Sequence, residues 1–183
     1  CAVERPGLYE VPSAVERPGL YEVPFGTTLA ALLERAGGVA EGRRLATVLL
    51  GGAAGTFVSP AHLDTPLTFE GTRAIGASLG SGVVMVFDEA ADMRDIVLRI
   101  AAFFRDESCG QCVPCRVGTV RQEELLQRLA RDGARPSPAA EADLLDELAR
   151  VMRDASICGL GHTAANAPQS AVTMGLFGGT GHE

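Results

Sequence analysis

Four of the five cysteines carry the strongest chemical signal in the sequence. Three recur at intervals of three residues and the fourth follows far downstream; they are Cys109, Cys112, Cys115 and Cys158. Thiolates are soft ligands that select zinc or iron–sulfur centres. The short spacing lets three sulfurs converge from one tight loop. A helical excursion after Cys115 would return the fourth thiol to the same centre.

The spacing favours a [4Fe–4S] cluster over a single zinc ion. A cubane suits this pattern because three of its corners are reached locally and the fourth from across the fold. A four-cysteine zinc site usually pairs its ligands in two Cys-x2-Cys hairpins, and this chain has no second pair. The ferredoxin motif also differs, since Arg116 follows Cys115 where that motif runs on to a further cysteine. Zinc and inert buried thiols stay open as alternatives.

The second half of the chain is predicted to be helical and to position these thiols. From Asp92 onward the apolar residues repeat at about 3.6 residues, which is typical of amphipathic helices. The stripes consist of Ile96, Val97, Ile100, Phe103 and Phe104, then Val120, Leu125, Leu126 and Leu129, then Leu144, Leu145, Leu148, Val151 and Met152. A fourth helix is expected over 164–174, capped by Thr163 and kinked or delayed by Pro168. We expect a four-helix bundle over 92–177 and a frayed tail over 178–183.

The first half predicts a small domain of mixed helix and sheet. The expected strands are 20–23, 45–50 and 83–87, of which the second is an apolar run closed by two glycines. Thr27 or Thr28 is expected to cap a short helix that ends at Gly37 and Gly38. The expected fold class is therefore α+β, with a β-rich domain over 14–88 followed by the helical one.

A perfect tandem repeat opens the chain. Residues 2–12 and 14–24 both read AVERPGLYEVP. Two copies do not make a solenoid, which needs at least three, so a recent duplication or a joining artefact is favoured over a functional repeat. The chain begins at Cys1, which we interpret as a stray thiol, and not at Met. We expect a fragment, a processed chain or an engineered one, with 1–13 as a duplicated segment and missing function upstream.

Composition excludes several classes of function. The formal net charge is −7 and the chain contains no Lys, which excludes a phosphate-loop or Schiff-base lysine. An acidic balance argues against nucleic-acid binding. No apolar run reaches membrane-spanning length and no signal peptide is present, so we expect a cytoplasmic protein with no direct membrane span. The glycine-rich stretch 76–82 does not match a nucleotide-binding loop. No catalytic, flavin-binding or nucleotide-binding residue is predicted.

Three stretches carry a clear family likeness, namely PGLYEVPFGTTLAALLERAGG (18–38), ESCGQCVPCRVGT (107–119) and SICGLGHTAANAPQSAV (156–172). The two cysteine motifs resemble the iron–sulfur domain in a family of flavin subunits shared by NADH:quinone oxidoreductase, NAD-reducing hydrogenase and NAD-dependent formate dehydrogenase. The first stretch resembles the β-grasp-like soluble-ligand-binding (SLBB) domain that precedes it. The likeness covers roughly 14–177. The segment 116–129 looks most like the formate dehydrogenase beta subunit, since Val117 stands where the respiratory subunit usually has an acidic residue.

The resemblance implies an electron relay. In such subunits NADH and FMN bind an N-terminal domain, and a [4Fe–4S] cluster passes single electrons between the flavin and partner subunits. The implied partners are a thioredoxin-like [2Fe–2S] subunit and a catalytic subunit. The implied ligands are Cys109, Cys112, Cys115 and Cys158, with FMN and NAD only in the full-length subunit. The present chain should not oxidise NADH alone, which leaves its enzymatic status open. An SLBB binding module with a structural metal and a truncated, non-functional fragment are the alternatives.

Two departures from the family pattern lead to further expectations. His162 stands where relatives often carry Gln or Asp, and its role is open. Residues 8–13, LYEVPS, occupy the place of a strand in relatives. We hypothesise that the first repeat copy substitutes for that strand; a structure in which 8–13 pair with no other strand would refute it. Contacts with the cluster are also left open for Arg116 and for the amides of four glycines, Gly110, Gly118, Gly159 and Gly161. The alternative is that the glycines only fit turns and that Arg116 is a solvated side chain.

Overall fold

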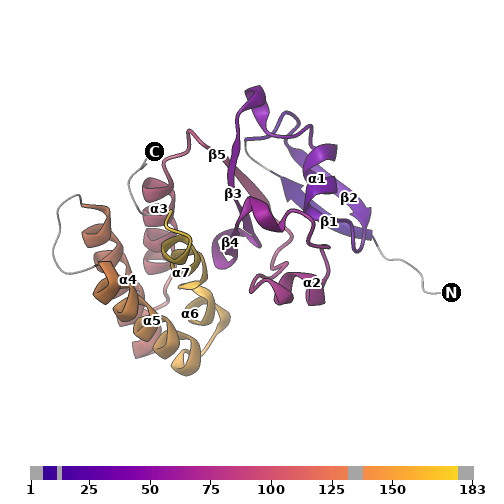
Figure 1. Ribbon diagram of the computed structural model, residues 1–183. Helices are drawn as coiled ribbons and strands as arrows, with labels where there is room; N and C mark the ends of the chain where they lie inside the picture. The colour runs from indigo at the N-terminus through magenta and orange to yellow at the C-terminus, as the bar shows by residue number, and fades with distance from the viewer. Residues whose placement is uncertain (1–5, 12–13, 132–137, 177–183) are drawn as a thin grey trace. The chain divides into compact units, whose positions relative to one another are not determined.

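The computed structural model describes residues 6–11, 14–131 and 138–176. In it the chain forms two compact units, 1–91 and 92–183 (Figure 1). The first unit combines strands with short helices, and the second is built from helices alone within the residues described. Cys1 and the tail 178–183, for which we made predictions above, lie outside the described residues.

The first unit contains two small sheets. Its strands are β1 (Pro6–Val11), β2 (Gly19–Pro24), β3 (Leu45–Leu50), β4 (Thr56–Val58) and β5 (Val84–Asp88). β1 pairs with β2, and β3 pairs with β4 and β5, all antiparallel. A parallel bridge joins Glu10 of β1 to Val83, where the Glu10 amide donates to the Gly82 carbonyl at 3.1 Å. The three expected strands are confirmed within one or two residues, whereas β4 was missed because three residues carry no readable period.

Short helices complete the first unit. They are α1 (Leu29–Arg35) and α2 (Phe69–Ala74), with 3-10 turns η1 (Ala40–Gly42), η2 (Gly52–Ala54) and η3 (Pro60–His62). The Thr28 hydroxyl accepts a hydrogen bond from the Ala31 amide and so caps α1, as expected. Gly37 and Gly38 follow α1 with φ of 89° and 76°, a left-handed conformation that glycine adopts at no steric cost. α2 was not predicted from the sequence.

The two repeat copies pair with each other. β1 comes from the first copy and β2 from the second, and the antiparallel register sets Tyr9 opposite the equivalent Tyr21. The copies nevertheless meet different surroundings, because Tyr9 is 3% exposed while Tyr21 is only half-buried. The Tyr9 hydroxyl donates to the Leu67 carbonyl at 3.2 Å, and burial raises the pKa of Tyr9. The first copy thus supplies a paired strand with core side chains, as hypothesised; residues 12–13 lie outside the description.

Replacing Tyr9 by alanine should destabilise the first unit far more than the same change at Tyr21. Losing a buried aromatic side chain costs about 3 kcal/mol or more, whereas a half-buried one should cost about 1 kcal/mol. Urea unfolding of the two variants provides the measurement, and each is the other's control because the local sequences are identical. Equal losses would show that the two copies contribute equally to the core.

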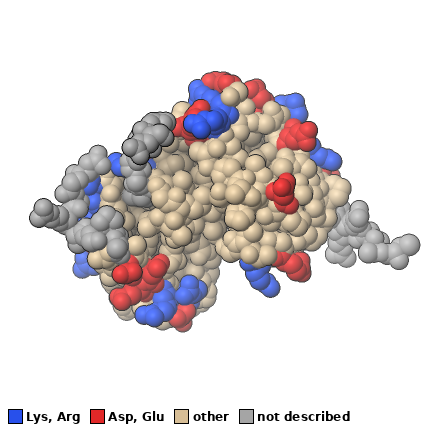
Figure 2. Space-filling model, viewed as in Figure 1, with Lys and Arg blue, Asp and Glu red and all other residues tan. Residues whose placement is uncertain are grey.

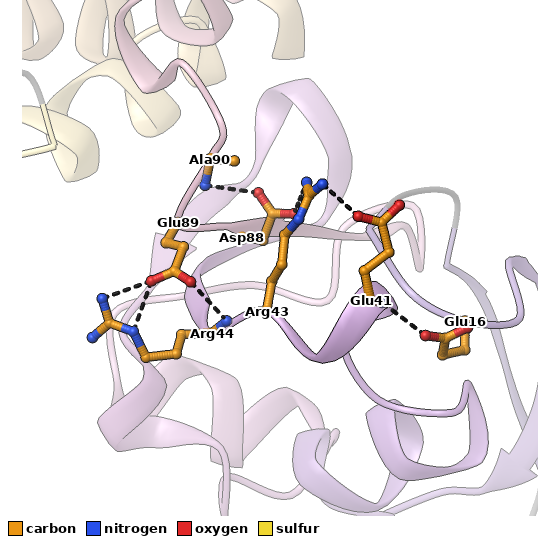
Figure 3. A network of polar contacts seen from close by, with 7 residues as sticks. All are labelled: Glu16, Glu41, Arg43, Arg44, Asp88, Glu89 and Ala90. Atoms are coloured by element: carbon orange, nitrogen blue, oxygen red, sulfur yellow. Dashed lines mark hydrogen bonds and ion pairs between the residues drawn. The ribbon is translucent and has the colours of Figure 1, made fainter.

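A polar network closes one end of the first unit (Figure 3). The Arg43 guanidinium bridges Glu41 and the largely buried Asp88, with 3.1 Å between Arg43 Nη1 and Asp88 Oδ2. Arg44 pairs with Glu89 beside it at 2.6 Å. Exposed ion pairs stabilise little, so the main consequence is positional: the network fixes the start of β3 against the end of β5.

The second unit is a helical assembly. Its helices are α3 (Met93–Asp106), α4 (Val113–Ala130), α5 (Pro138–Ala155), α6 (Gly159–Thr163) and α7 (Asn166–Thr173). α4 packs against both α3 and α5, while α6 packs on α4 and α5 and α7 on α3 and α5 (Figure 1). The fully buried large side chains are Leu125, Leu126, Leu145, Met152 and Gln122. No described helix combines the length and the apolar composition that crossing a bilayer would require.

The expected fourth helix is wrong in one respect, because two short helices occupy its place. α6 ends at Thr163, whose hydroxyl donates to the Gly159 carbonyl at 2.8 Å and caps nothing downstream. α7 begins at Asn166, so Pro168 falls in its first turn, where a missing N–H costs no helical hydrogen bond.

Several residues of the expected apolar stripes are exposed. Phe104 is buried but Phe103 is 48% exposed. Adjacent helical residues point about 100° apart, so at the edge of a buried face one of the two can turn toward solvent. Leu144 and Val151 are exposed in the same way beside buried Leu145 and Met152, and Val120 is exposed as well.

Candidate metal centre

Two loop-to-helix junctions of the second unit bring the predicted thiols together. Cys112 is the residue that precedes α4, and Cys115 lies in the first turn of that helix behind Pro114. Cys158 precedes α6 in the same way. Proline fits the first turn of a helix because the N–H groups there have no partner in the helix. The same free N–H groups favour a thiolate at the start of α4.

The four predicted cysteines line a single cavity. It has a volume of about 250 Å³. Its wall is formed by Glu107, Ser108, Cys109, Gln111, Cys112, Cys115, Ile157, Cys158 and Leu160. Among the residues that the structure describes, no three Cys, His, Asp or Glu side chains close around one point as a single metal ion requires. The four thiols share the wall of this one cavity.

The most buried thiol belongs to Cys115, which is 5% exposed. Burial raises its pKa, and the Ser108 hydroxyl partly offsets the shift from 3.3 Å, measured between Oγ and Sγ. The Gly110 amide donates to the same hydroxyl oxygen, with 3.4 Å between N and Oγ. A deprotonated Cys115 has no proton to give, so the Ser108 hydroxyl must then donate to its sulfur.

Backbone amides act on the Cys112 thiol. Its pKa is lowered, first by the N–H of Ile157 and then by the N–H of Cys115, because N–H groups near the sulfur favour the charged thiolate. Ile157 belongs to the loop that carries Cys158, so the second cysteine motif helps to stabilise a thiolate of the first. The Ser156 hydroxyl adds a smaller lowering of the same pKa, yet it is buried and lacks a hydrogen bond of good geometry to any described residue.

Gly161 allows α6 to approach the first cysteine motif closely. A Cβ atom at this position would lie 2.3 Å from Ser156 Oγ and 3.0 Å from Cys115 Cβ. By contrast, a Cβ atom at Gly159 would meet nothing within 4 Å. Of the two glycines of α6, only Gly161 is therefore required by the lack of space for a side chain.

Gly161→Ala should destabilise the second unit by about 2 kcal/mol, because overpacking costs about 1–3 kcal/mol. Gly159→Ala is the matched control and should be neutral or stabilise the unit by up to about 1 kcal/mol. Urea denaturation followed by helix circular dichroism measures both. A Gly161→Ala chain as stable as Gly159→Ala would show that the close approach of α6 is not required.

The structure reassigns residues whose roles were open. A Cβ atom at Gly118 would lie 2.5 Å from the Met152 side chain, so that glycine serves helix packing. The Gly110 amide donates to the Ser108 hydroxyl. Arg116 donates to the Gly110 carbonyl at 2.8 Å and so braces the loop. His162 Nε2 lies 2.8 Å from the Ser156 carbonyl oxygen.

Sequence reasoning missed three contributors to the site, namely Ser108, Ser156 and Ile157. The two serines stand one and two residues before cysteines, a signal that could have been weighed. The Ile157 contribution comes from its backbone, which residue type does not reveal.

Among the described residues, the charged side chains of α5 lie apart from the cysteine cavity. Asp143, Asp146 and Glu147 are exposed on α5, as expected of a solvated face. They share an open surface hollow with Arg150, Arg153 and Gln169. On the face shown in Figure 2, basic and acidic groups lie interspersed without a continuous basic patch.

Two protein families match the chain. Residues 95–174 match the NADH-ubiquinone oxidoreductase-F iron-sulfur binding region, and residues 13–55 match the SLBB domain. The first match contains all four cysteines that line the cavity. The second contains β2, α1 and β3.

Relatives and a solved structure agree with these matches. The NADH-quinone oxidoreductase F subunit of Mycobacterium tuberculosis (strain H37Rv) is 38% identical over 170 residues, 93% of this chain and 35% of the relative. The F subunit of the Escherichia coli K12 enzyme is 36% identical over 82% of this chain and 31% of its own length. The HndC subunit of the NADP-reducing hydrogenase of Solidesulfovibrio fructosivorans is 32% identical over 90% of this chain and 31% of its own length.

A solved NAD+-reducing [NiFe]-hydrogenase, in the H2-reduced state, matches with a TM-score of 0.78 and 35% identity. The match covers 92% of this chain and 28% of that one. The chain thus spans about a third of the length of the relatives that it matches. In it, a segment that matches the SLBB domain precedes one that matches the NADH-ubiquinone oxidoreductase-F iron-sulfur binding region.

Proposed function

We propose that the chain is the electron-relay part of an NAD-linked flavin iron–sulfur oxidoreductase subunit. One [4Fe–4S] cluster would be held by Cys109, Cys112, Cys115 and Cys158. The observation that carries the proposal is that these four thiols line one cavity inside the region that matches the iron–sulfur binding family. Relatives named as subunits of NADH-quinone oxidoreductase and of a hydrogenase support the NAD-linked, multi-subunit setting.

The residues around the cavity fit a tetranuclear cluster better than a zinc ion. In a tetrahedral zinc site the sulfurs lie about 3.8 Å apart, because each Zn–S bond measures about 2.3 Å. The described thiols line a cavity of about 250 Å³, which leaves room for a group larger than a single ion. The buried Ser156 hydroxyl beside Cys112 lacks a well-formed hydrogen bond, and a thiolate bound to iron would supply an acceptor.

The chain's own residues would bind the cluster and tune its electron affinity. A bound [4Fe–4S] cluster accepts and releases one electron at a time. The Ser108 hydroxyl donates to the thiolate of Cys115, and the Ile157 amide lowers the pKa of Cys112. Hydrogen bonds to ligand sulfurs stabilise added negative charge, so both donors favour the reduced state. The apolar side chains of Ile157 and Leu160 contribute to the cavity wall.

The finer fold assignments are part of the proposal. If the Glu10–Val83 bridge is counted as a strand pairing, the strand order becomes β2-β1-β5-β3-β4. That order, with β1 parallel to β5 at its centre, supports a β-grasp-like domain over 14–88 that borrows β1 from the first repeat copy. The packing of α3, α4 and α5 with α6 and α7 supports a four-helix iron–sulfur bundle over 92–177 in which the fourth helix is broken.

FMN and NAD would bind a part of the full-length subunit outside residues 1–183. The proposed partners are a thioredoxin-like [2Fe–2S] subunit and a catalytic subunit, and the proposed location is the cytoplasm. Whether the complex oxidises formate, hydrogen or NADH is a separate question, and the likeness to formate dehydrogenase stays a prediction.

Reductive titration of the anaerobically reconstituted chain tests the relay. A relay cluster should bleach in visible absorption when dithionite adds one electron per chain, and a paramagnetic signal should appear. Air-free reoxidation should restore the spectrum. A colourless chain that binds zinc and gives no such signal would favour an SLBB binding module with a structural metal. A chain that binds no metal would favour a non-functional fragment.

A further inference from the structure

The backbone hydrogen bonds of α7 begin one residue later than its conformation allows. The Gln169 amide donates to the Ala165 carbonyl at 2.9 Å, the spacing of an α-helix. The preceding bond would run from residue 168 to the Ala164 carbonyl, but residue 168 is proline and has no N–H. Ala164 and Ala165 both have right-handed helical dihedral angles, so an N–H at position 168 would face that carbonyl.

The Ala164 carbonyl finds its donor in a side chain from another helix. Ala164 is 0% exposed, so water cannot take the place of the missing N–H. Within the described residues, no backbone N–H donates to this carbonyl. The Gln122 side chain donates instead, with 3.0 Å between Nε2 and the Ala164 oxygen. A buried carbonyl that loses its donor destabilises the fold, so this contact stabilises the joint between α6 and α7.

Packing alone does not explain a glutamine at position 122. The side chain is 0% exposed, and its Oε1 atom has no hydrogen-bond partner among the described residues. An unpaired amide oxygen in the interior is unfavourable, and a hydrophobic side chain of the same length would avoid it. What such a side chain could not supply is the N–H that Ala164 accepts.

Different contacts hold the two ends of α6. Before the helix, the Ser156 amide donates to the Met152 carbonyl at 3.1 Å and so ties the loop that carries Cys158 to α5. After the helix, the Gln122 hydrogen bond ties Ala164 to α4. α6 has only five residues, which makes it about 7 Å long. A shift at its far end therefore turns the whole helix and moves Cys158 at its start.

A hydrogen bond does here what close packing cannot. The short distance between Gly161 and Cys115 sets how near α6 can come to α4, but steric repulsion does not keep two helices together. The Gln122 hydrogen bond resists their separation. Because α4 also carries the first cysteine motif, one side chain links the helices that follow the two motifs.

We propose that Gln122 is a positioning residue that replaces the missing Pro168 N–H and thereby holds Cys158 in place for the fourth corner of the cluster. The inference rests on the proposed function. It makes a specific demand on the pair: Pro168→Ala restores an N–H at position 168, and in that background the Gln122 amide should no longer be needed.

Urea unfolding of the metal-free full chain measures this coupling. Methionine resembles glutamine in length but has no N–H, so Gln122→Met should raise the unfolding equilibrium constant of the second unit about tenfold. In the Pro168→Ala background the same change should raise it less than about threefold, because the backbone then supplies the donor. Gln127→Met is the control on the exposed side of α4 and should change the constant less than about twofold.

Equal effects of Gln122→Met in the two backgrounds would overturn the inference. Should Gln122→Met alone fail to fold, the double variant with Pro168→Ala should fold, and a double variant that also fails would overturn the inference as well.

A second measurement follows the fourth iron in the reconstituted chain. Ferricyanide oxidation can remove one iron from a tetranuclear cluster and leave a three-iron cluster, which is paramagnetic when oxidised. The three-iron fraction should be at least about threefold larger in Gln122→Met, because the joint opens more often. It should stay near the parent value in the double variant and in Gln127→Met.

The outcomes separate the inference from the proposed function. An unchanged three-iron fraction in Gln122→Met would overturn the positioning of Cys158. Loss of the whole cluster without the three-iron signal would mean a general loss of structure and would overturn it too. A parent chain that never binds iron would instead overturn the proposed function, while the coupling of Gln122 with Pro168 in the metal-free chain would stand.

Discussion

Replacing Cys158 by alanine should remove at least one of four irons from the reconstituted chain. The other three thiols come from one loop and the first turn of α4, so they can hold at most three corners of a cubane. We expect a three-iron cluster or none. Iron analysis and visible absorption measure the change. The second unit should also unfold at lower temperature, because cluster binding contributes to the stability of its folded state.

Gly159→Ala is the matched control for this prediction, since it alters the next residue, where no atom lies within 4 Å of the added Cβ. That variant should keep its full iron content. Unchanged iron and absorbance in Cys158→Ala would mean that Cys158 is not a ligand. The proposed site would then reduce to the three thiols of the first motif.

Arg128→Ala should destabilise the second unit by about 3 kcal/mol, because it leaves a buried carboxylate without its partner. Glu141 is 4% exposed at its side chain. Both its oxygens accept from Arg128, at 3.1 Å from Nε and 2.9 Å from Nη2. This two-point contact, which raises the pKa of Arg128, joins α4 to the start of α5. Urea unfolding of the chain measures the loss.

Arg121→Ala offers a control on the same helix. Arg121 pairs with Glu124 at 2.7 Å, but both side chains are exposed, at 63% and 44%. Such a pair contributes less than about 0.5 kcal/mol. The double replacement Arg128→Met with Glu141→Leu should recover most of the stability, because no buried charge is then left alone. Equal losses in Arg128→Ala and Arg121→Ala would contradict a role for the buried pair.

The sequence predicted elements whose signals are local. The strand over 45–50 was predicted with its bounds because an apolar run ends at two glycines. The helix that Thr28 caps was predicted because capping and glycine signals lie at its ends. The four cysteines were identified by type and spacing, and the structure places them around one cavity. Whether they ligate a cluster stays a prediction.

Features that depend on contacts between distant segments could not be predicted. The break between α6 and α7 falls at Ala164, whose carbonyl accepts from buried Gln122 at 3.0 Å. No local pattern reveals that contact. The Ile157 donor is a backbone group whose aim depends on where the second loop meets the first. Identical repeat copies met different environments for the same reason, since only the fold decides which tyrosine reaches the core.

One measurement bears most directly on the account: the iron and acid-labile sulfide bound per chain after anaerobic reconstitution. A cubane held by the four thiols predicts about four irons and four sulfides per chain. Zinc without sulfide, or two irons with two sulfides, would contradict a tetranuclear centre in this cavity and with it the electron-relay function.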